Sequence, residues 1–163
     1  MVMGWLDGLL LAALLLSVVI GLWRGLVYEV LSLAAWVAAF LVAQAQARTV
    51  GAWLPLDGLS EPLRLAAGFV LVFVGVAFAG GLLAWLVKKL VASVGLRPID
   101  RVLGGVFGLL RGVVILLALS VVVGLTPLRS EAWWQQSVVA QSLDHSVHAI
   151  KPLLPSEMAR YLP

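Results

Sequence analysis

The apolar stretch WLDGLLLAALLLSVVIGLW occupies residues 5–23 and carries a single charged side chain, that of Asp7. A helix needs about 20 predominantly apolar residues to cross the roughly 30 Å of hydrocarbon in a bilayer. Three further stretches of comparable length and apolar character follow at residues 26–47, 65–87 and 102–125. The sequence therefore predicts four transmembrane helices.

The composition supports the same fold class. Of the 163 residues, 63% are hydrophobic and only 12% are charged, whereas soluble domains carry about 25% charged residues. The four stretches also lack the alternation of lipid-facing and interior-facing residues that membrane strands show. We expect an all-α membrane protein with four transmembrane helices, arranged as two hairpins and followed by an amphipathic C-terminal helix. Residues 1–125 would form the transmembrane domain, and residues 126–163 an extracytoplasmic tail.

The charged residues exclude several functional classes and suggest an orientation. The absence of cysteine excludes disulfides, thiolate metal sites and cysteine nucleophiles. The excess of 11 Lys and Arg over 8 Asp and Glu is small and scattered, so nucleic acid is not an expected partner. The densest basic cluster, KKLVASVGLRPIDR at residues 88–101, is placed in the cytoplasm by the positive-inside rule. Both termini and the loop at 48–64 then lie outside; alternatively, the cluster could bind anionic lipid or a partner.

Two arginines stand beside glycines in similar settings, Arg24 in GLWRGLV and Arg111 in GLLRGVV. Arg24 lies in the tight turn between the first two spans, where a charge is unremarkable. Arg111 lies inside the fourth span, where an arginine is costly. It could reach the membrane boundary by snorkelling, which requires residues 102–110 to lie shallow, bend or re-enter. It could equally be partly buried, and would then need a carboxylate or backbone carbonyls as partners.

Glu29 is the first candidate for the carboxylate that pairs with Arg111. Arg24 competes for Glu29, and Asp100 competes for Arg111. We expect Asp100, followed by Arg101, to cap the helix that comes after it, because aspartate is a favoured N-cap residue. Ionisable groups inside the spans are too few for a proton relay, so a structural ion pair is the favoured use of these charges.

Gly104, Gly108 and Gly112 recur every four residues in GGVFGLLRG. Small residues at this spacing let helix backbones approach closely in a membrane. The glycine face could pack against another helix of the same chain, such as the third with Gly75 and Gly80, or it could form an oligomer seam or line a pore.

The segment that follows Pro127 predicts a different kind of helix. Its apolar residues recur at near-helical spacing, which indicates an amphipathic helix on the outer membrane–water boundary. We assign Asp144, His145, Ser146 and His148 to its polar face, since neighbouring letters do not make a catalytic triad and the metal-ligand pattern is weak. No catalytic residue, cofactor or metal is expected.

The stretches LWRGLVYEVLSLAAW and DRVLGGVFGLLRG resemble the colicin V production protein family. The resemblance covers about residues 3–125 and implies a bacterial inner-membrane protein with four spans, linked to production or export of the peptide toxin colicin V. A related four-helix domain anchors periplasmic serine proteases, but the tail here is far too short to hold one.

The expected function is therefore that of a non-enzymatic, multi-pass inner-membrane protein that supports colicin V-type toxin secretion or envelope homeostasis as a helix-packed scaffold or assembly factor. The alternative is an oligomeric channel or solute transporter lined by the glycine-rich fourth helix. The expected partners are the lipid bilayer, secretion or envelope proteins and, in the oligomeric alternative, further copies of the chain.

Overall fold

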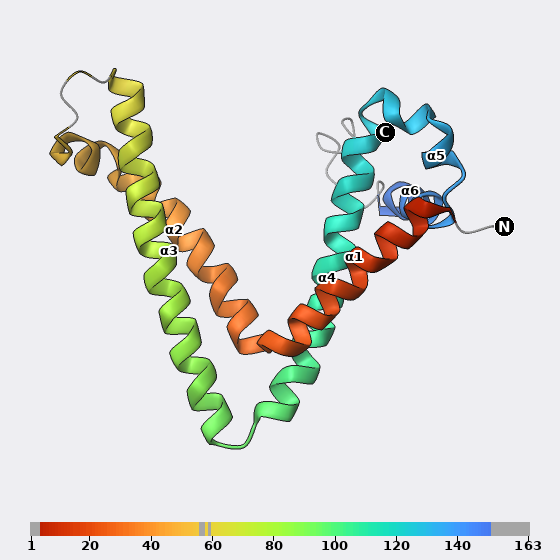
Figure 1. The fold of residues 1–163 in the computed structure, drawn as a ribbon, viewed down its shortest axis with the longest axis horizontal. Helices are drawn as coiled ribbons and strands as arrows, with labels where there is room; N and C mark the ends of the chain where they lie inside the picture. Colours follow the sequence, from red (N-terminus) through yellow and green to blue (C-terminus); the bar gives the residue numbers. More distant parts are fainter. Residues whose placement is uncertain (1–3, 56–57, 59, 151–163) are drawn as a thin grey trace. The chain divides into compact units, whose positions relative to one another are not determined.

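The computed structural model describes residues 4–55, 58 and 60–150, and the regular elements among them are all helical (Figure 1). The chain forms α1 (Trp5–Arg24), α2 (Leu26–Trp53), α3 (Glu61–Ser93), α4 (Arg97–Gly124), the short 3-10 helix η1 (Pro127–Ser130), α5 (Ala132–Gln135) and α6 (Val138–Ile150). The first four are long and apolar enough to cross a membrane. The prediction of an all-helical protein with four candidate spans is confirmed.

The surface of these four helices is unlike that of a soluble protein. Large apolar side chains are exposed along all of them, for example Leu15 (64%) on α1, Phe78 (75%) on α3 and Val114 (64%) on α4. Continuous exposed apolar surface marks an interaction with membrane or protein, and the length of the helices favours lipid.

The helices extend beyond the apolar runs from which they were predicted. α2 continues to Trp53, six residues past its expected end, and α4 begins at Arg97, five residues before its expected start. Hydropathy marks the part of a helix that suits hydrocarbon, whereas backbone hydrogen bonding also continues through less apolar stretches that include Arg48 and Ala52, and arginine and alanine are good helix formers.

The described chain divides into two compact units. One contains the chain up to Trp23 together with the chain from Gly105 onward, and the other runs from Arg24 to Gly104. Residues 126–150 thus share a unit with α1 and the later part of α4, while residues 151–163 of the predicted tail lie outside the described residues. A separate role for 126–163 as a domain stays a prediction.

In the unit from Arg24 to Gly104, α2 and α3 run side by side. Their seam follows a ladder of small residues spaced four apart on α2: Ala35, Ala39, Ala43, Ala47 and Gly51. Such a ladder allows close backbone approach, which provides the van der Waals contact that holds helices together in lipid.

The closest approach of α2 and α3 is made by two glycines. A β-carbon on Gly68 of α3 would collide with the carbonyl oxygen of Ala47 and would lie 2.6 Å from the backbone nitrogen of Gly51. A β-carbon on Gly51 would in turn lie 2.6 Å from the carbonyl oxygen of Arg64. Further along the seam Gly80 faces Ala35, so this glycine of α3 packs on α2.

In the other unit, apolar residues from α1, α4, α5 and α6 form one core. Its buried members are Leu6, Leu10, Leu116, Val123, Trp134 and Ala140, with Val139 and Leu143 packed against them. The apolar residues of α6 therefore contact protein within the unit. The position of α6 on a membrane boundary stays a prediction.

Candidate functional site

The described residues contain six buried polar or charged side chains: Asp7, Ser17, Glu29, Asp100, Ser120 and Ser137. A polar group is costly to bury unless it is hydrogen-bonded. The contacts of these groups therefore indicate what the polar chemistry inside this apolar protein is used for.

The polar contact between α1 and α4 is made by Ser17 and Arg111. The Arg111 Nε donates to the Ser17 Oγ at 3.2 Å, and a terminal guanidinium nitrogen donates to the Ser17 backbone oxygen at 3.2 Å. The Ser17 Oγ donates in turn to the Gly108 carbonyl oxygen at 2.7 Å. Arg111 is half-buried, and a hydroxyl and a backbone carbonyl of the neighbouring helix serve as its acceptors.

The continuity of α4 bears on how Arg111 is accommodated. Residues 102–110 remain helical and form part of one helix from Arg97 to Gly124. They therefore contain no break at which the chain could turn back, as a re-entrant segment requires. Arg111 consequently lies near the middle of α4, fourteen residues after its start and thirteen before its end. The snorkelling interpretation required a shallow, bent or re-entrant start of the helix, and the last of these is excluded.

The glycines next to Arg111 explain how α1 comes so near. A β-carbon on Gly108 would lie 2.5 Å from the Ser17 carbonyl oxygen and 3.2 Å from the Val18 Cα. A β-carbon on Gly112 would lie 2.7 Å from a methyl carbon of Leu14. These two glycines pack against α1 of the same chain, and Gly104 is buried; a role of the three in an oligomer seam or a pore stays a prediction.

We expect the bond between Arg111 and Ser17 to be measurable as a coupling. Arg111→Ala should lower the free energy of unfolding by about 1–2 kcal/mol. A double-mutant cycle with Ser17→Ala should show a coupling between about 0.6 kcal/mol, the average for hydrogen bonds between membrane helices, and about 1.7 kcal/mol, the largest value. Thermal unfolding in detergent measures both. Arg48→Ala, which removes an exposed arginine of α2, is the matched control. The bond would be contradicted if Arg111→Ala and Arg48→Ala lowered the free energy of unfolding equally, and if the effects of Arg111→Ala and Ser17→Ala simply added in the double variant.

Asp100 serves a different helix from the one that the sequence suggested. α4 begins at Arg97, so Asp100 lies within its first turn and is not its N-cap. The Asp100 Oδ1 accepts a hydrogen bond of 2.9 Å from the backbone N–H of Val27, in the first turn of α2, and so satisfies one of the free N–H groups there. Gly25 makes this possible, since its φ of 84° suits glycine and a β-carbon on it would collide with the Asp100 carboxylate.

Glu29 lies two residues after Val27, also in the first turn of α2. One Oε atom of its buried carboxylate lies 4.0 Å from a guanidinium nitrogen of Arg24, which is about half exposed. Arg24 also lies over the Tyr28 ring, 5.6 Å from its centroid. The competing pair of Arg24 and Glu29 is thus at the limit of ion-pair distance, and pairing of Glu29 with Arg111 stays a prediction.

Asp7 joins α1 to the start of α6. Its Oδ1 accepts hydrogen bonds from the Ser137 Oγ at 2.6 Å and from the Val139 N–H at 2.9 Å. Ser137 itself accepts from the Ala140 N–H at 3.0 Å, as an N-cap residue does. The sequence offered a signal for this arrangement, because a serine immediately before an apolar-periodic stretch marks a helix start.

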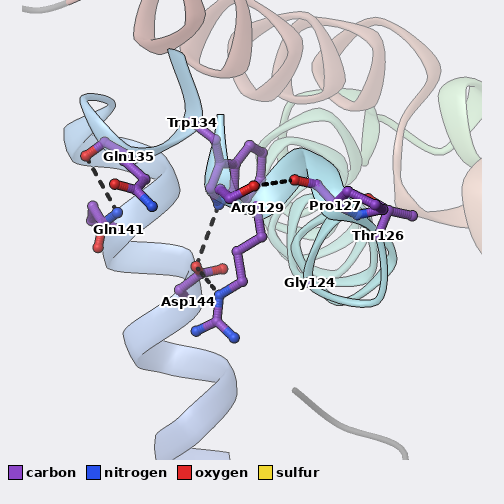
Figure 2. Close-up of a pocket in the computed structure, with 9 residues that line it drawn as sticks. Gly124, Thr126, Pro127, Arg129, Trp134, Gln135, Gln141 and Asp144 are labelled. Carbon is purple, nitrogen blue, oxygen red and sulfur yellow. Dashed lines mark hydrogen bonds and ion pairs between the residues drawn. The ribbon is translucent and has the colours of Figure 1, made fainter. Parts of the chain in front are cut away.

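Asp144 faces the inside of its unit, not the polar outer face of α6 to which the sequence assigned it. Its carboxylate accepts hydrogen bonds from the Ser120 Oγ of α4 at 2.5 Å and from the Trp134 indole N–H at 3.3 Å. The Arg129 Nε lies 3.7 Å from it (Figure 2). His145 and Ser146, its neighbours in sequence, are exposed. The three residues therefore do not converge on one site; the expected absence of catalytic residues stays a prediction.

These contacts border a pocket of about 510 Å³ between the end of α4 and α6. Its walls are mainly polar and come from Gly124, Thr126, Pro127, Arg129, Ser130, Trp134, Gln135, Gln141 and Asp144. Gln141 donates to the carbonyl oxygen of Gln135 at 3.3 Å. Through two hydrogen bonds and an ion pair, Asp144 connects α6 to α4, η1 and α5.

Comparisons with known proteins agree with the sequence motifs. The family described as colicin V production protein matches residues 6–148. A colicin V production protein homolog of Haemophilus influenzae is 33% identical over 133 residues, which is 81% of this chain and 81% of that protein. The colicin V production protein of Escherichia coli is 33% identical over 144 residues, covering 85% of this chain and 86% of the relative. No solved structure matches. Because the match spans nearly all the helices whose contacts are given above, the chain belongs to the colicin V production protein family.

Proposed function

We propose that this chain is a non-enzymatic, multi-pass protein of the bacterial inner membrane that supports production or secretion of a colicin V-type toxin, or envelope homeostasis, as a helix-packed scaffold or assembly factor. The observation that carries the proposal is the use of the buried polar groups. Five of the six each make a hydrogen bond that joins two elements of their own unit, namely Asp7, Ser17, Asp100, Ser120 and Ser137. The hydrogen bonds of these buried groups therefore serve to hold helices together.

This pattern favours a scaffold over a conduit for solutes. A path for polar solutes through the membrane would need polar side chains that face a water-filled cavity. Arg111, the most costly of these groups, has a serine hydroxyl and carbonyl of α1 as acceptors. Gly108 brings the backbones of α1 and α4 together at the same point, which closes the space that a lining residue would require.

The orientation belongs to the same proposal. The basic residues at the end of α3 and the start of α4 are proposed to face the cytoplasm together with the turn at Arg24, so that consecutive helices cross in opposite directions as two hairpins. Both termini and the helix α6 then face outward. The positive-inside rule and the four basic residues Lys88, Lys89, Arg97 and Arg101 support this arrangement.

The test is complementation in Escherichia coli cells that produce colicin V and lack their own colicin V production protein. Expression of this chain should restore the toxin in the medium, measured as growth inhibition of a sensitive strain. Gly108→Leu should fail to restore it, whereas Gly8→Leu should restore it, because a β-carbon on Gly8 would meet no atom within 4 Å. Immunoblots of membranes must show that both variants are present.

A second measurement separates a scaffold from a channel. The purified chain in liposomes should pass no small solutes at any protein density. Solute flux that depends on the protein and disappears with Gly108→Leu would overturn the scaffold proposal.

A further inference from the structure

A cationic pocket lies where α3 ends and α4 begins, inside the unit from Arg24 to Gly104. Its volume is about 250 Å³. The residues in its wall that matter for binding are Trp85, Lys88, Lys89, Arg97, Asp100 and Arg101.

The charge in this wall favours an anion. Four cationic side chains line the pocket against one carboxylate, that of Asp100. Asp100 is only 8% exposed, and its Oδ1 already accepts the hydrogen bond from the Val27 N–H. The pocket therefore presents an excess of positive charge, and two arginines in its wall can offer the forked donor geometry that suits phosphate.

The surroundings of the pocket favour an anion that carries hydrocarbon chains. Leu86 and Leu90 on α3 and Ile99 on α4 are 46%, 66% and 60% exposed, so apolar surface adjoins the charges. The Lys89 ammonium lies 4.0 Å from the centroid of the Trp85 ring. Tryptophan and lysine at the end of a membrane helix are typical of the level of lipid headgroups.

We propose that this pocket binds the phosphate of an anionic phospholipid, whose acyl chains lie along the exposed apolar surface of α3 and α4. Orientation by the positive-inside rule needs only basic residues in a loop. It does not need them to converge on a cavity that adjoins both an aromatic ring and apolar surface. Basic pockets between transmembrane helices on the cytoplasmic side bind anionic lipid headgroups.

The test is lipid binding by the full chain in a neutral detergent, followed by native mass spectrometry during titration with phosphatidylglycerol or phosphatidylcholine. Phosphatidylglycerol should bind more tightly. Arg101→Gln should weaken its binding about fivefold, and Lys89→Gln with Arg101→Gln about 25-fold, at about fivefold for each charge removed. Phosphatidylcholine binding should not change.

Arg48→Gln is the matched control, because it removes one exposed arginine of α2, which lies beside the start of α3 and not beside its end, where the cationic pocket is. It should leave phosphatidylglycerol binding unchanged. Thermal unfolding shows whether each variant remains folded; if Arg101→Gln unfolds, Arg97→Gln replaces it. Equal binding of the two lipids, or equal effects of Arg101→Gln and Arg48→Gln, would overturn the proposal. Competition by inorganic phosphate as strong as that by phosphatidylglycerol would identify a free anion as the ligand and would overturn it as well.

Discussion

Gly68→Ala is expected to lower the free energy of unfolding by about 3 kcal/mol, the upper end of the usual cost of overpacking a well-packed site. The added methyl group would meet the Ala47 carbonyl oxygen and the backbone of Gly51. Backbone atoms of a helix cannot rotate away as a side chain can, so α2 and α3 must separate along the small-residue ladder. At about 2–4 °C for each kcal/mol in a chain of this size, the melting temperature in detergent should fall by about 6–12 °C.

Gly75→Ala is the matched control on the same helix. A β-carbon there meets no atom within 4 Å, and alanine has the higher helix propensity. Its melting temperature should therefore not fall. A similar loss for both variants would mean that the close approach of α2 and α3 is not what makes Gly68 necessary.

The number and approximate location of the spans could be predicted from the sequence, because the bilayer imposes a minimum length of apolar helix. The choice of helix neighbours could not. Composition does not say that Ser17 of α1 meets Arg111 of α4, since the two are 94 residues apart and an acidic partner was the more obvious choice. A hydroxyl and a backbone carbonyl, whose second lone pair is available, can satisfy a guanidinium as well.

A second difference between prediction and structure concerns small residues. The apolar stretch at 26–47 predicted a span but not its packing face, whereas Ala43 and Ala47 are buried in the seam between α2 and α3. The spacing of four from Ala35 to Gly51 is present in the sequence and could have been found by the same search that found Gly104, Gly108 and Gly112. Asp100 is different, because only the fold shows that its carboxylate reaches the first turn of α2.

The α1–α4 contact provides the second large expected effect, because packing and hydrogen bonding coincide at Gly108. Its carbonyl oxygen accepts from the Ser17 Oγ, and the absence of a side chain lets the Ser17 carbonyl approach. Any side chain at this position forces α1 away and thereby also stretches the two bonds from Arg111. The loss should combine overpacking, about 1–3 kcal/mol, with interhelical hydrogen bonds of about 0.6–1.7 kcal/mol.

Gly108→Ala should therefore lower the free energy of unfolding by about 2–5 kcal/mol. It should also increase the hydrogen exchange of backbone amides of α1 in detergent. A graded series makes the reason testable. Gly112→Ala meets chiefly a Leu14 methyl carbon, which can rotate away, so its cost should be smaller. Gly8→Ala meets open space and should cost nothing. If Gly112→Ala and Gly8→Ala were as damaging as Gly108→Ala, the loss would reflect helix formation in general and not the approach of the Ser17 carbonyl. A decline in cost from Gly108 to Gly112 to Gly8 instead identifies the backbone contact as the element that holds α1 to α4 and keeps Ser17 within hydrogen-bond distance of Arg111.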